Sequence, residues 1–410
     1  MELNPCRSCG AGLERTFVDL GFSPLANSYL TAEDLHRPQL FHPLHVYLCT
    51  ECLLVQLPEA ESPEAIFSEY AYFSSVSSSW VEHARRYALR MIEERGLGPD
   101  SLVVEIASND GYLLSHFHER GIPVQGIEPA DNVARAARER GIPTRTAFFG
   151  RELAEDLAAS GVRADLLVGN NVLAHVPALN DFVAGLKLLL GEEGLATFEF
   201  PHLLRLMDER QFDTIYHEHF SYFSFTTVRR VFARHGLVLA DVEELPTHGG
   251  SLRIHARHAE EEPQETPAVA ELLEREEHAG LLDPATYDAF ARGVHEVKRE
   301  LLKLLIRVRE EGKTIAGYGA PAKGNTLLCY CGVSPDLLPY TVDLSPHKQG
   351  LFLPGTRIPI YPPDHLRETK PDYVLILPWN LKDEIMAQMA DVASWGGRFV
   401  VAIPRVEVVG

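Results

Sequence analysis

Long hydrophobic runs, basic residues and cysteines are all scarce in this 410-residue sequence. No apolar stretch approaches the roughly 20 residues that a membrane-spanning helix needs. The opening Met-Glu-Leu-Asn-Pro-Cys lacks the basic and apolar regions of a signal peptide. Lys and Arg number 38 against 58 Asp and Glu, so the formal net charge is −20 and the chain as a whole repels nucleic-acid phosphates. We therefore expect a cytoplasmic monomer that binds neither a membrane nor nucleic acid.

The six cysteines of a cytoplasmic chain indicate metal binding or packing rather than disulfides. Four of them form two C-x-x-C pairs: Cys6, Cys9, Cys49 and Cys52. Two such pairs supply four thiolates in a tetrahedron, which favours a zinc ion with no open coordination position and hence a structural role. The alternatives are buried free thiols, a redox pair, or ligation by His42 or His45. The paired spacing argues against buried free thiols, and a redox pair would follow a strand of a βαβ unit, which neither pair does. The second cysteine pair makes a histidine ligand unnecessary.

The length and the 45% apolar content indicate two or three globular domains. After a helical pattern from Trp80 to Arg95, strand-like segments alternate with helical ones. The expected strands are 102–106, 124–128, 144–149, 165–170 and 195–200, and the expected helices are 113–120, 131–140, 151–160 and 178–190. This alternation predicts an α/β domain whose parallel sheet is covered by helices. Ligands bind at the carboxyl ends of such strands.

The first expected strand leads through a small polar turn into a helix, a geometry that presents backbone N–H groups to a ligand. The next strand ends at Glu128, where a carboxylate can accept both hydroxyls of a ribose. These units resemble the start of a class I S-adenosylmethionine (SAM) methyltransferase, with the glycine-rich turn replaced by Glu105-Ile-Ala-Ser-Asn-Asp-Gly111. The alternative is another doubly wound domain or a dinucleotide binder. The candidate cofactor ligands are Glu105, Ser108, Asn109, Asp110, Glu128, Phe149, Asn170 and Asn171.

The ends of the later expected strands carry further candidate cofactor-binding and active-site residues. Phe149 either flanks an adenine ring or packs in the core. Asn170 and Asn171 open a segment that resembles the methyltransferase motif after the fourth strand, whose backbone lines the methionine of SAM. His175 lies in the same segment, where a lone histidine is more often a satisfied core residue. Glu199 ends the fifth expected strand.

Two segments are candidates for catalysis. An aromatic and serine-rich stretch from Phe67 to Trp80 is either a packed linker or a loop that folds over the site and supplies Tyr70. The densest cluster of reactive side chains is Tyr216-His217-Glu218-His219. It is a general-base site, a metal site with both histidines on one strand face, or a polar loop. A general base is favoured over a metal because no third ligand is evident.

A second strand, glycine-rich turn and helix follow a long helical stretch at 284–311. Backbone N–H groups at Gly319 and the ammonium of Lys323 suit a diphosphate. The alternative is a packing domain without a ligand. The candidate substrate ligands of this region are Gly319, Lys323, Asn325, His347, Lys348 and Arg357.

The order of these parts is more specific than any one of them. The four-cysteine module, the SAM-type domain, Tyr-His-Glu-His and the Gly-Tyr-Gly-Ala-x-Ala-Lys-Gly-Asn turn together resemble the bacterial sugar C-methyltransferases, over essentially the whole chain. The resemblance implies a zinc module at 1–72, a SAM-binding domain at 73–247 and an α/β domain at 248–410 that binds a nucleotide-sugar, typically a dTDP-4-keto-deoxysugar.

The resemblance also implies a mechanism. The family's catalytic cluster matches Tyr216, Glu218 and His219, and its accessory positions match His175 and Tyr70. We expect His219 to deprotonate the carbon beside the ketone, and the enolate to accept the SAM methyl in line. Tyr70, His175 or Tyr216 would donate a hydrogen bond to the enolate oxygen. The alternatives are an O- or N-methyltransferase, which needs no carbon deprotonation, and a zinc-module adaptor without enzymatic activity.

Overall fold

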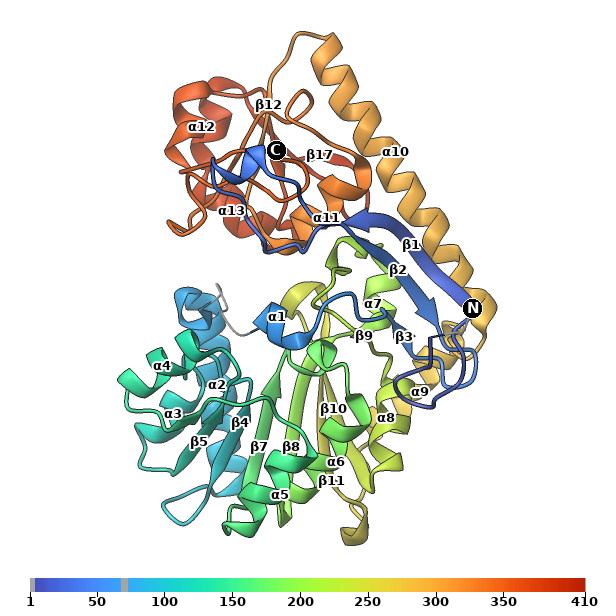
Figure 1. Ribbon diagram of the computed structural model, residues 1–410, viewed down its shortest axis with the longest axis vertical. Helices are drawn as coiled ribbons and strands as arrows, with labels where there is room; N and C mark the ends of the chain where they lie inside the picture. The colour runs from blue at the N-terminus through green and yellow to red at the C-terminus, as the bar shows by residue number, and fades with distance from the viewer. Residues whose placement is uncertain (1–3, 68–72, 410) are drawn as a thin grey trace. The chain divides into compact units, whose positions relative to one another are not determined.

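The computed structural model describes residues 4–67 and 73–409. The chain forms two compact units, each assembled from three separate segments (Figure 1). Unit 1 consists of Met1–Glu14, Cys49–His202 and Phe220–Leu282, and unit 2 of Arg15–Leu48, Leu203–His219 and Asp283–Gly410. The units are thus interleaved along the sequence, whereas the boundaries near residues 72 and 247 stay a prediction. Among the described residues, no helix has the length and apolar character that a membrane crossing would require.

Unit 1 is built around a seven-stranded sheet of order β10-β11-β8-β7-β4-β5-β6. Its strands are β4 (Val103–Ile106), β5 (Val124–Ile127), β6 (Thr144–Arg145), β7 (Ala164–Asn170), β8 (Leu190–Pro201), β10 (Leu237–Leu245) and β11 (Ser251–His258). The five neighbouring strands β8, β7, β4, β5 and β6 pair in parallel. Strand β11 pairs antiparallel with β8 and β10. Strand β4 is buried along its whole length, as expected for a central parallel strand with both faces covered. The predicted α/β class is confirmed.

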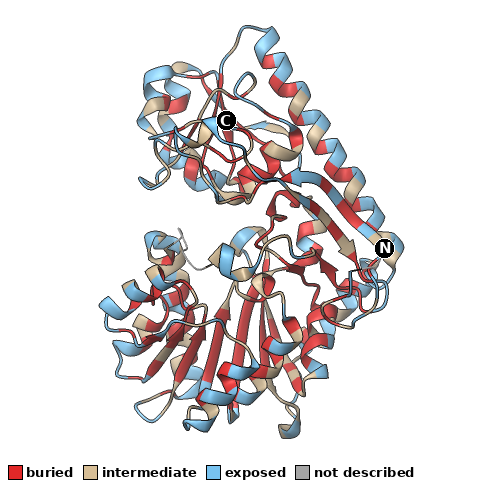
Figure 2. Cartoon of the chain, in the orientation of Figure 1, coloured by how far each residue is buried: buried red, intermediate tan, exposed pale blue. Residues whose placement is uncertain are grey.

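Helices flank this sheet, and their outer faces are exposed while the strands are buried (Figure 2). They are α2 (Ser78–Arg95), α3 (Leu114–His118), α4 (Asp131–Glu139), α5 (Arg151–Ala159), α6 (Leu179–Leu189), α8 (Phe225–Arg234) and α9 (Pro267–His278). Helix α2 is capped at its start by Ser77, whose hydroxyl accepts from the Trp80 N–H, and at its end by Gly96 with φ of 61°. Strand β6 is shorter than the predicted 144–149 because it pairs only with β5 at the sheet edge.

The cysteine pairs and a short antiparallel ladder complete unit 1. Strand β3 (Val55–Gln56) follows the second cysteine pair and pairs with β9 (Ser221–Tyr222). Helix α1 (Pro63–Phe67) comes after β3.

Unit 2 contains a six-stranded sheet of order β14-β13-β12-β15-β16-β17, parallel except for β17. Its strands are β12 (Ile315–Tyr318), β13 (Thr341–Val342), β14 (Ile360–Tyr361), β15 (Tyr373–Ile376), β16 (Arg398–Val401) and β17 (Glu407–Val409). Its helices are α7 (Leu203–Asp208), α10 (Asp288–Glu310), α11 (Ala322–Cys331), α12 (Asp364–Thr369) and α13 (Lys382–Gln388). The predicted strand, turn and helix after residue 314 are therefore confirmed.

The segment between the two cysteine pairs belongs to unit 2. It forms an antiparallel hairpin of β1 (Arg15–Ser23) and β2 (His42–Leu48). The hairpin packs on α10, where the ring of Phe17 stacks on Phe290 at 4.6 Å between centroids and meets Tyr287 edge-on at 6.1 Å. Aromatic packing between residues far apart in the sequence thus brings residues 15–48 into the C-terminal α/β unit.

Candidate active site

The four cysteines of the two C-x-x-C pairs converge in unit 1. Their Sγ atoms all lie within 4.8 Å of one another, with Cys6 to Cys52 at 3.6 Å and Cys9 to Cys49 at 3.5 Å. Tetrahedral thiolates about 2.3 Å from a zinc ion would stand roughly 3.8 Å apart. The hydrogen bond between Cys6 and Cys52 lowers the pKa of Cys6, whereas the same bond and burial raise the pKa of Cys52. The donor set therefore fits one zinc ion in a closed, structural site.

The turn between β4 and α3 has the geometry of a ligand-binding loop. Glu128, which directly follows β5, accepts the Asn109 N–H through Oε2 and the Ala130 N–H through Oε1, each at 2.9 Å. Ala107 and Asn109 adopt φ of 56° and 49°, values that glycine usually supplies. The turn is thus formed with few glycines, which explains why the sequence departs from the usual glycine-rich motif.

Glu105 lies beneath this turn at the end of β4 and is completely buried. Both of its carboxylate oxygens lack a hydrogen-bond partner among the described residues. Burial, together with the charges of Glu128 and Asp110, raises the pKa of Glu105 well above its usual value. A buried carboxylate without partners fits a ligand that brings a cationic group, and the SAM amino group and sulfonium are both cationic.

The neighbouring cofactor candidates are held by the segment before α2. Ser74 donates its N–H to Asn109 Oδ1 at 2.9 Å, and Ser75 donates its hydroxyl to Asp110 Oδ2 at 2.5 Å. The Ser108 hydroxyl is buried, and no described residue hydrogen-bonds to it. The structure therefore brings Glu105, Ser108, Asn109, Asp110 and Glu128 together around one turn.

The other strand-end candidates of unit 1 lie on neighbouring elements. The Phe149 ring meets Phe182 edge-on at 5.3 Å, so it makes core contacts while remaining half-buried. Asn170 ends β7 and hydrogen-bonds the Tyr112 side chain. His175 ends a short 3₁₀ turn, Leu173–His175, and its ring meets that of Phe67 at 5.4 Å. These residues remain candidates for cofactor and acceptor contacts.

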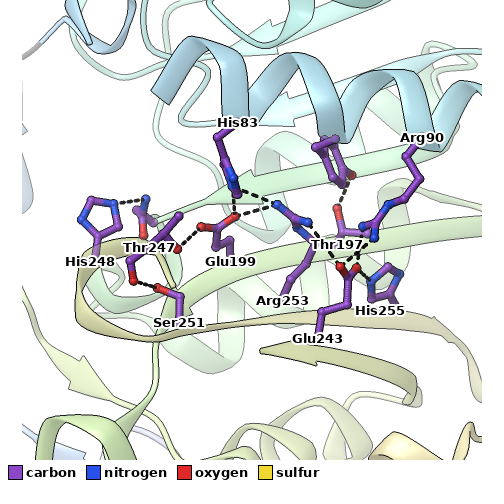
Figure 3. Close-up of polar contacts among 12 residues, drawn as sticks. His83, Arg90, Thr197, Glu199, Glu243, Thr247, His248, Ser251, Arg253 and His255 are labelled. Atoms are coloured by element: carbon purple, nitrogen blue, oxygen red, sulfur yellow. Dashed lines mark hydrogen bonds and ion pairs between the residues drawn. The ribbon is translucent and has the colours of Figure 1, made fainter. Parts of the chain in front are cut away.

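A buried polar network that the sequence did not reveal lies beside these strand ends (Figure 3). At its centre Glu199 on β8 accepts from Thr247 at 2.7 Å, pairs with His83 at 2.8 Å and with Arg253 at 2.8 Å. Burial would raise the pKa of Glu199, but the His83 hydrogen bond and the Arg253 charge together lower it. The network therefore holds a charged carboxylate inside the unit.

The same network continues along β10 and β11 (Figure 3). Glu243 accepts two hydrogen bonds from Arg90, at 2.6 and 2.7 Å, and one from His255 at 2.7 Å. Its members come from α2, β8, β10 and β11, so no local spacing connects them. The one sequence signal is the alternation in β11, where Arg253 and His255 interrupt an apolar strand interior.

The loop after β10 reaches the end of β7. Asn171 Nδ2 and His248 Nε2 lie 3.2 Å apart, and both residues have φ of 54°. Because Thr247 is bonded to Glu199, the network holds this loop against the strand end. Two adjoining residues with positive φ at a ligand-binding edge are typical of functional positions.

The Tyr-His-Glu-His cluster lies in unit 2, in the chain that follows a 3₁₀ turn, Phe212–Thr214. His219 Nδ1 is 2.8 Å from the Thr214 carbonyl oxygen, so Nδ1 carries the proton and Nε2 the lone pair of the neutral ring. The Tyr216 ring packs on His219 at 4.1 Å between centroids. His217 bonds instead to the Pro43 carbonyl through Nε2 at 3.2 Å. The two histidines thus have different carbonyl partners.

The half-buried Lys323 forms a polar group in unit 2 with its neighbours. Its ammonium donates to Asn380 Oδ1 at 2.8 Å and lies 4.7 Å from the Trp379 ring centroid. Trp379 in turn donates its indole N–H to Asp213 at 2.7 Å. Burial lowers the pKa of Lys323 and raises that of Asp213 to about 6. Lys323 therefore already has protein partners at the start of α11.

Lys348 lies beside the glycine turn that follows β12. Its ammonium donates to the Ala320 carbonyl at 2.9 Å and lies 3.9 Å from Asp343, and burial lowers its pKa. Gly319 has φ of 89°, and a Cβ there would lie 2.5 Å from Pro378. Glycine is thus required at this position by both conformation and space.

The remaining substrate candidates are dispersed. Asn325 in α11 is buried and its amide has no partner among the described residues, whereas His347 and Arg357 are exposed. Tyr70 lies outside the described residues. Unit 2 therefore brings Gly319, Lys323, Asn325 and Lys348 to the carboxyl edge of its sheet.

Comparisons with known proteins identify three successive segments of the chain. Three family descriptions match in succession: "Putative zinc binding domain" at residues 6–67, "Methyltransferase domain" at 80–242 and "C-methyltransferase C-terminal domain" at 246–404. The chain is 38% identical over 407 residues to C-methyltransferase NovU from Streptomyces niveus, covering 99% of this chain and 97% of that protein.

Among solved structures, magnesium protoporphyrin IX methyltransferase from Synechocystis PCC 6803 with bound SAM matches with a TM-score of 0.33 and 15% identity. That match covers 43% of this chain and 78% of the other. A SAM-dependent methyltransferase from Mesorhizobium loti matches with a TM-score of 0.34 and 16% identity, covering 43% and 98%. These scores are too low to support an argument about function.

Proposed function

This chain belongs to the C-methyltransferase family and is a SAM-dependent enzyme, and from that premise we propose that it methylates the carbon beside the ketone of a nucleotide-linked 4-keto-deoxysugar. The observation that supports this most directly is the His219 hydrogen bond to the Thr214 carbonyl at 2.8 Å. It leaves Nε2 as the basic nitrogen of a neutral imidazole. Transfer to carbon requires a base to remove a proton, whereas hydroxyl and amine acceptors do not need carbon deprotonation.

In this proposal the residues of unit 2 carry out the proton transfer. His219 Nε2 accepts the proton from the carbon beside the ketone, and the electron pair of the C–H bond forms the enolate. Tyr216, packed on the same ring, orients the imidazole or donates a hydrogen bond to the enolate oxygen. His175 and Tyr70 are the other candidate donors. Glu218 is the carboxylate of the cluster, and it is buried.

The residues around Glu128 would hold the cofactor. The two N–H groups that it accepts fix its carboxylate while leaving lone pairs for ribose hydroxyls. Glu105 would face the cationic part of the molecule. SAM, when bound, supplies the electrophilic methyl group that the enolate carbon receives.

The nucleotide of the acceptor is assigned to unit 2 on a structural parallel. Asp343, which follows β13, accepts the Ala320 N–H through Oδ2 at 2.7 Å and the Ser345 N–H through Oδ1 at 2.8 Å. Glu128 makes the same pair of bonds in unit 1. It accepts one from Asn109, in the turn after β4, and one from Ala130, two residues after itself. The start of α11 would receive the diphosphate, near Lys323 and the Asn325 amide, which has no hydrogen bond to any residue that the structure describes.

The test is solvent exchange at the carbon beside the ketone, measured by deuterium incorporation into a dTDP-4-keto-deoxysugar. His219→Asn should lose both exchange and methyl transfer, by on the order of 10²–10⁴-fold, while SAM binding persists. His217→Asn is the matched control, because that ring bonds to a different carbonyl and should retain exchange. Exchange at the wild-type rate in His219→Asn would refute the assignment of the base. Methylation of a hydroxyl or amine acceptor without any carbon exchange would instead favour an O- or N-methyltransferase.

A further inference from the structure

The segment 24–30 lies between the two cysteine pairs in the sequence but belongs to unit 2. Figure 1 shows this N-terminal chain, in blue, among the orange and red elements of that unit. Leu30 and Phe352 exchange both backbone hydrogen bonds at 2.9 Å, which pairs the segment with the C-terminal α/β fold. The segment is thus held by a defined backbone register.

Two side chains of this segment reach groups of the proposed acceptor site. Tyr29 donates its hydroxyl to the Ala320 carbonyl at 2.5 Å, on the glycine turn after β12. Asn27 donates its amide to Glu218 Oε1 at 2.6 Å. Glu218 is only 4% exposed, so this neutral donor bonds a carboxylate that is almost removed from water.

We infer that Asn27 is a positioning residue for the carboxylate of Glu218, and that segment 24–30 is part of the acceptor site rather than only a spacer between cysteine pairs. This inference rests on the proposed function, because it takes the Glu218 cluster as the catalytic one. An amide N–H stabilises a carboxylate and fixes its orientation without adding charge or accepting a proton. A buried carboxylate left without such a donor would rotate or take up a proton.

The variants are chosen to separate positioning from packing. Asn27→Ala removes the donor, and misplacement of a catalytic group costs about 10²-fold in rate, so kcat and the exchange rate should fall while the KM for SAM stays unchanged. Asn27→Asp keeps the shape but sets one carboxylate against another. It should be at least as impaired as Asn27→Ala near neutral pH and should recover as the pH falls, because the two carboxylates then share a proton.

The control is Ser28→Ala, the exposed neighbour in the same segment, which should behave as wild type. The experiment measures exchange and methyl transfer from pH 5 to 9 on the full chain with its zinc, using a dTDP-4-keto-deoxysugar. The expected result, with each rate taken relative to wild type at the same pH, is recovery at low pH in Asn27→Asp but not in Asn27→Ala, since only the aspartate can be protonated. Wild-type exchange rates in both variants would overturn this inference alone. Absence of exchange in the wild type would overturn the proposed function and this inference with it.

Discussion

The buried network around Glu199 allows a quantitative prediction for Arg253→Met. The Arg253 side chain is 4% exposed, donates to Glu199 at 2.8 Å and lies 3.6 Å from Glu243. Its guanidinium is also 4.5 Å from the centroid of the Tyr87 ring. Methionine fills a similar volume but removes the charge. The completely buried Glu199 then loses the one permanently charged ion-pair partner that it has among the described residues.

Breaking a buried ion pair by removing one partner costs about 3–5 kcal/mol, because the other charge stays buried. We expect Arg253→Met to destabilise unit 1 by that amount. The matched control is Arg275→Met, which removes the exposed ion pair with Glu244 and should cost about 0–1 kcal/mol. Adding Glu199→Gln to Arg253→Met removes the unpaired charge and should recover part of the loss.

The assay is urea denaturation combined with hydrogen exchange of β8 and β11 peptides, since exchange reports unit 1 separately. The predicted loss corresponds to roughly 10²–10⁴-fold faster exchange. Its pH dependence has a definite sign. The pKa of Glu199 is lowered in the folded protein, so its contribution to stability is present above the ordinary value of about 4.5 and is lost as the pH falls. In Arg253→Met, burial is the dominant influence on Glu199 and favours its protonated form. The difference in free energy of unfolding between variant and wild type should therefore shrink from pH 7 toward pH 4. A loss below about 1 kcal/mol, or one that grows with acid, would refute the reasoning.

Three further outcomes follow from the sites described above. Protein purified without added zinc should carry one zinc per chain, and Cys52→Ser should lose the metal; four freely titrating thiols in the wild type would contradict the site. Glu128→Ala should weaken SAM binding, measured by titration calorimetry, while the circular dichroism spectrum is retained; unchanged affinity would reject the ribose placement. Lys323→Ala should weaken binding of the nucleotide-sugar more than binding of SAM; equal losses would indicate a folding defect, since this substitution also removes the Lys323 charge that acts on the buried Asp213.

Features carried by local patterns could be predicted from the sequence. The C-x-x-C pairs identify four ligands because each pair already holds two thiols close together. Strand β4 and Glu128 were recognisable because an apolar run, a turn and a strand-closing carboxylate are contiguous in the chain. Helix α10 was predicted within a few residues because its apolar period is local. The glycine turn after β12 was found for the same reason.

What depends on contacts between distant residues was decided only by the tertiary structure. No spacing rule connects His83, Glu199 and Arg253, because their contact requires α2, β8 and β11 to pack first. The engagement of Lys323 with Asn380 was equally invisible, since the sequence shows a charge but not its partner. Residues 15–48 lie between the two cysteine pairs in the sequence, and the packing of Phe17 on Phe290 joins them to unit 2. Local sequence determines which helices and strands form. Burial of their apolar faces determines which of them pack together, and this driving force does not depend on how far apart they lie in the sequence.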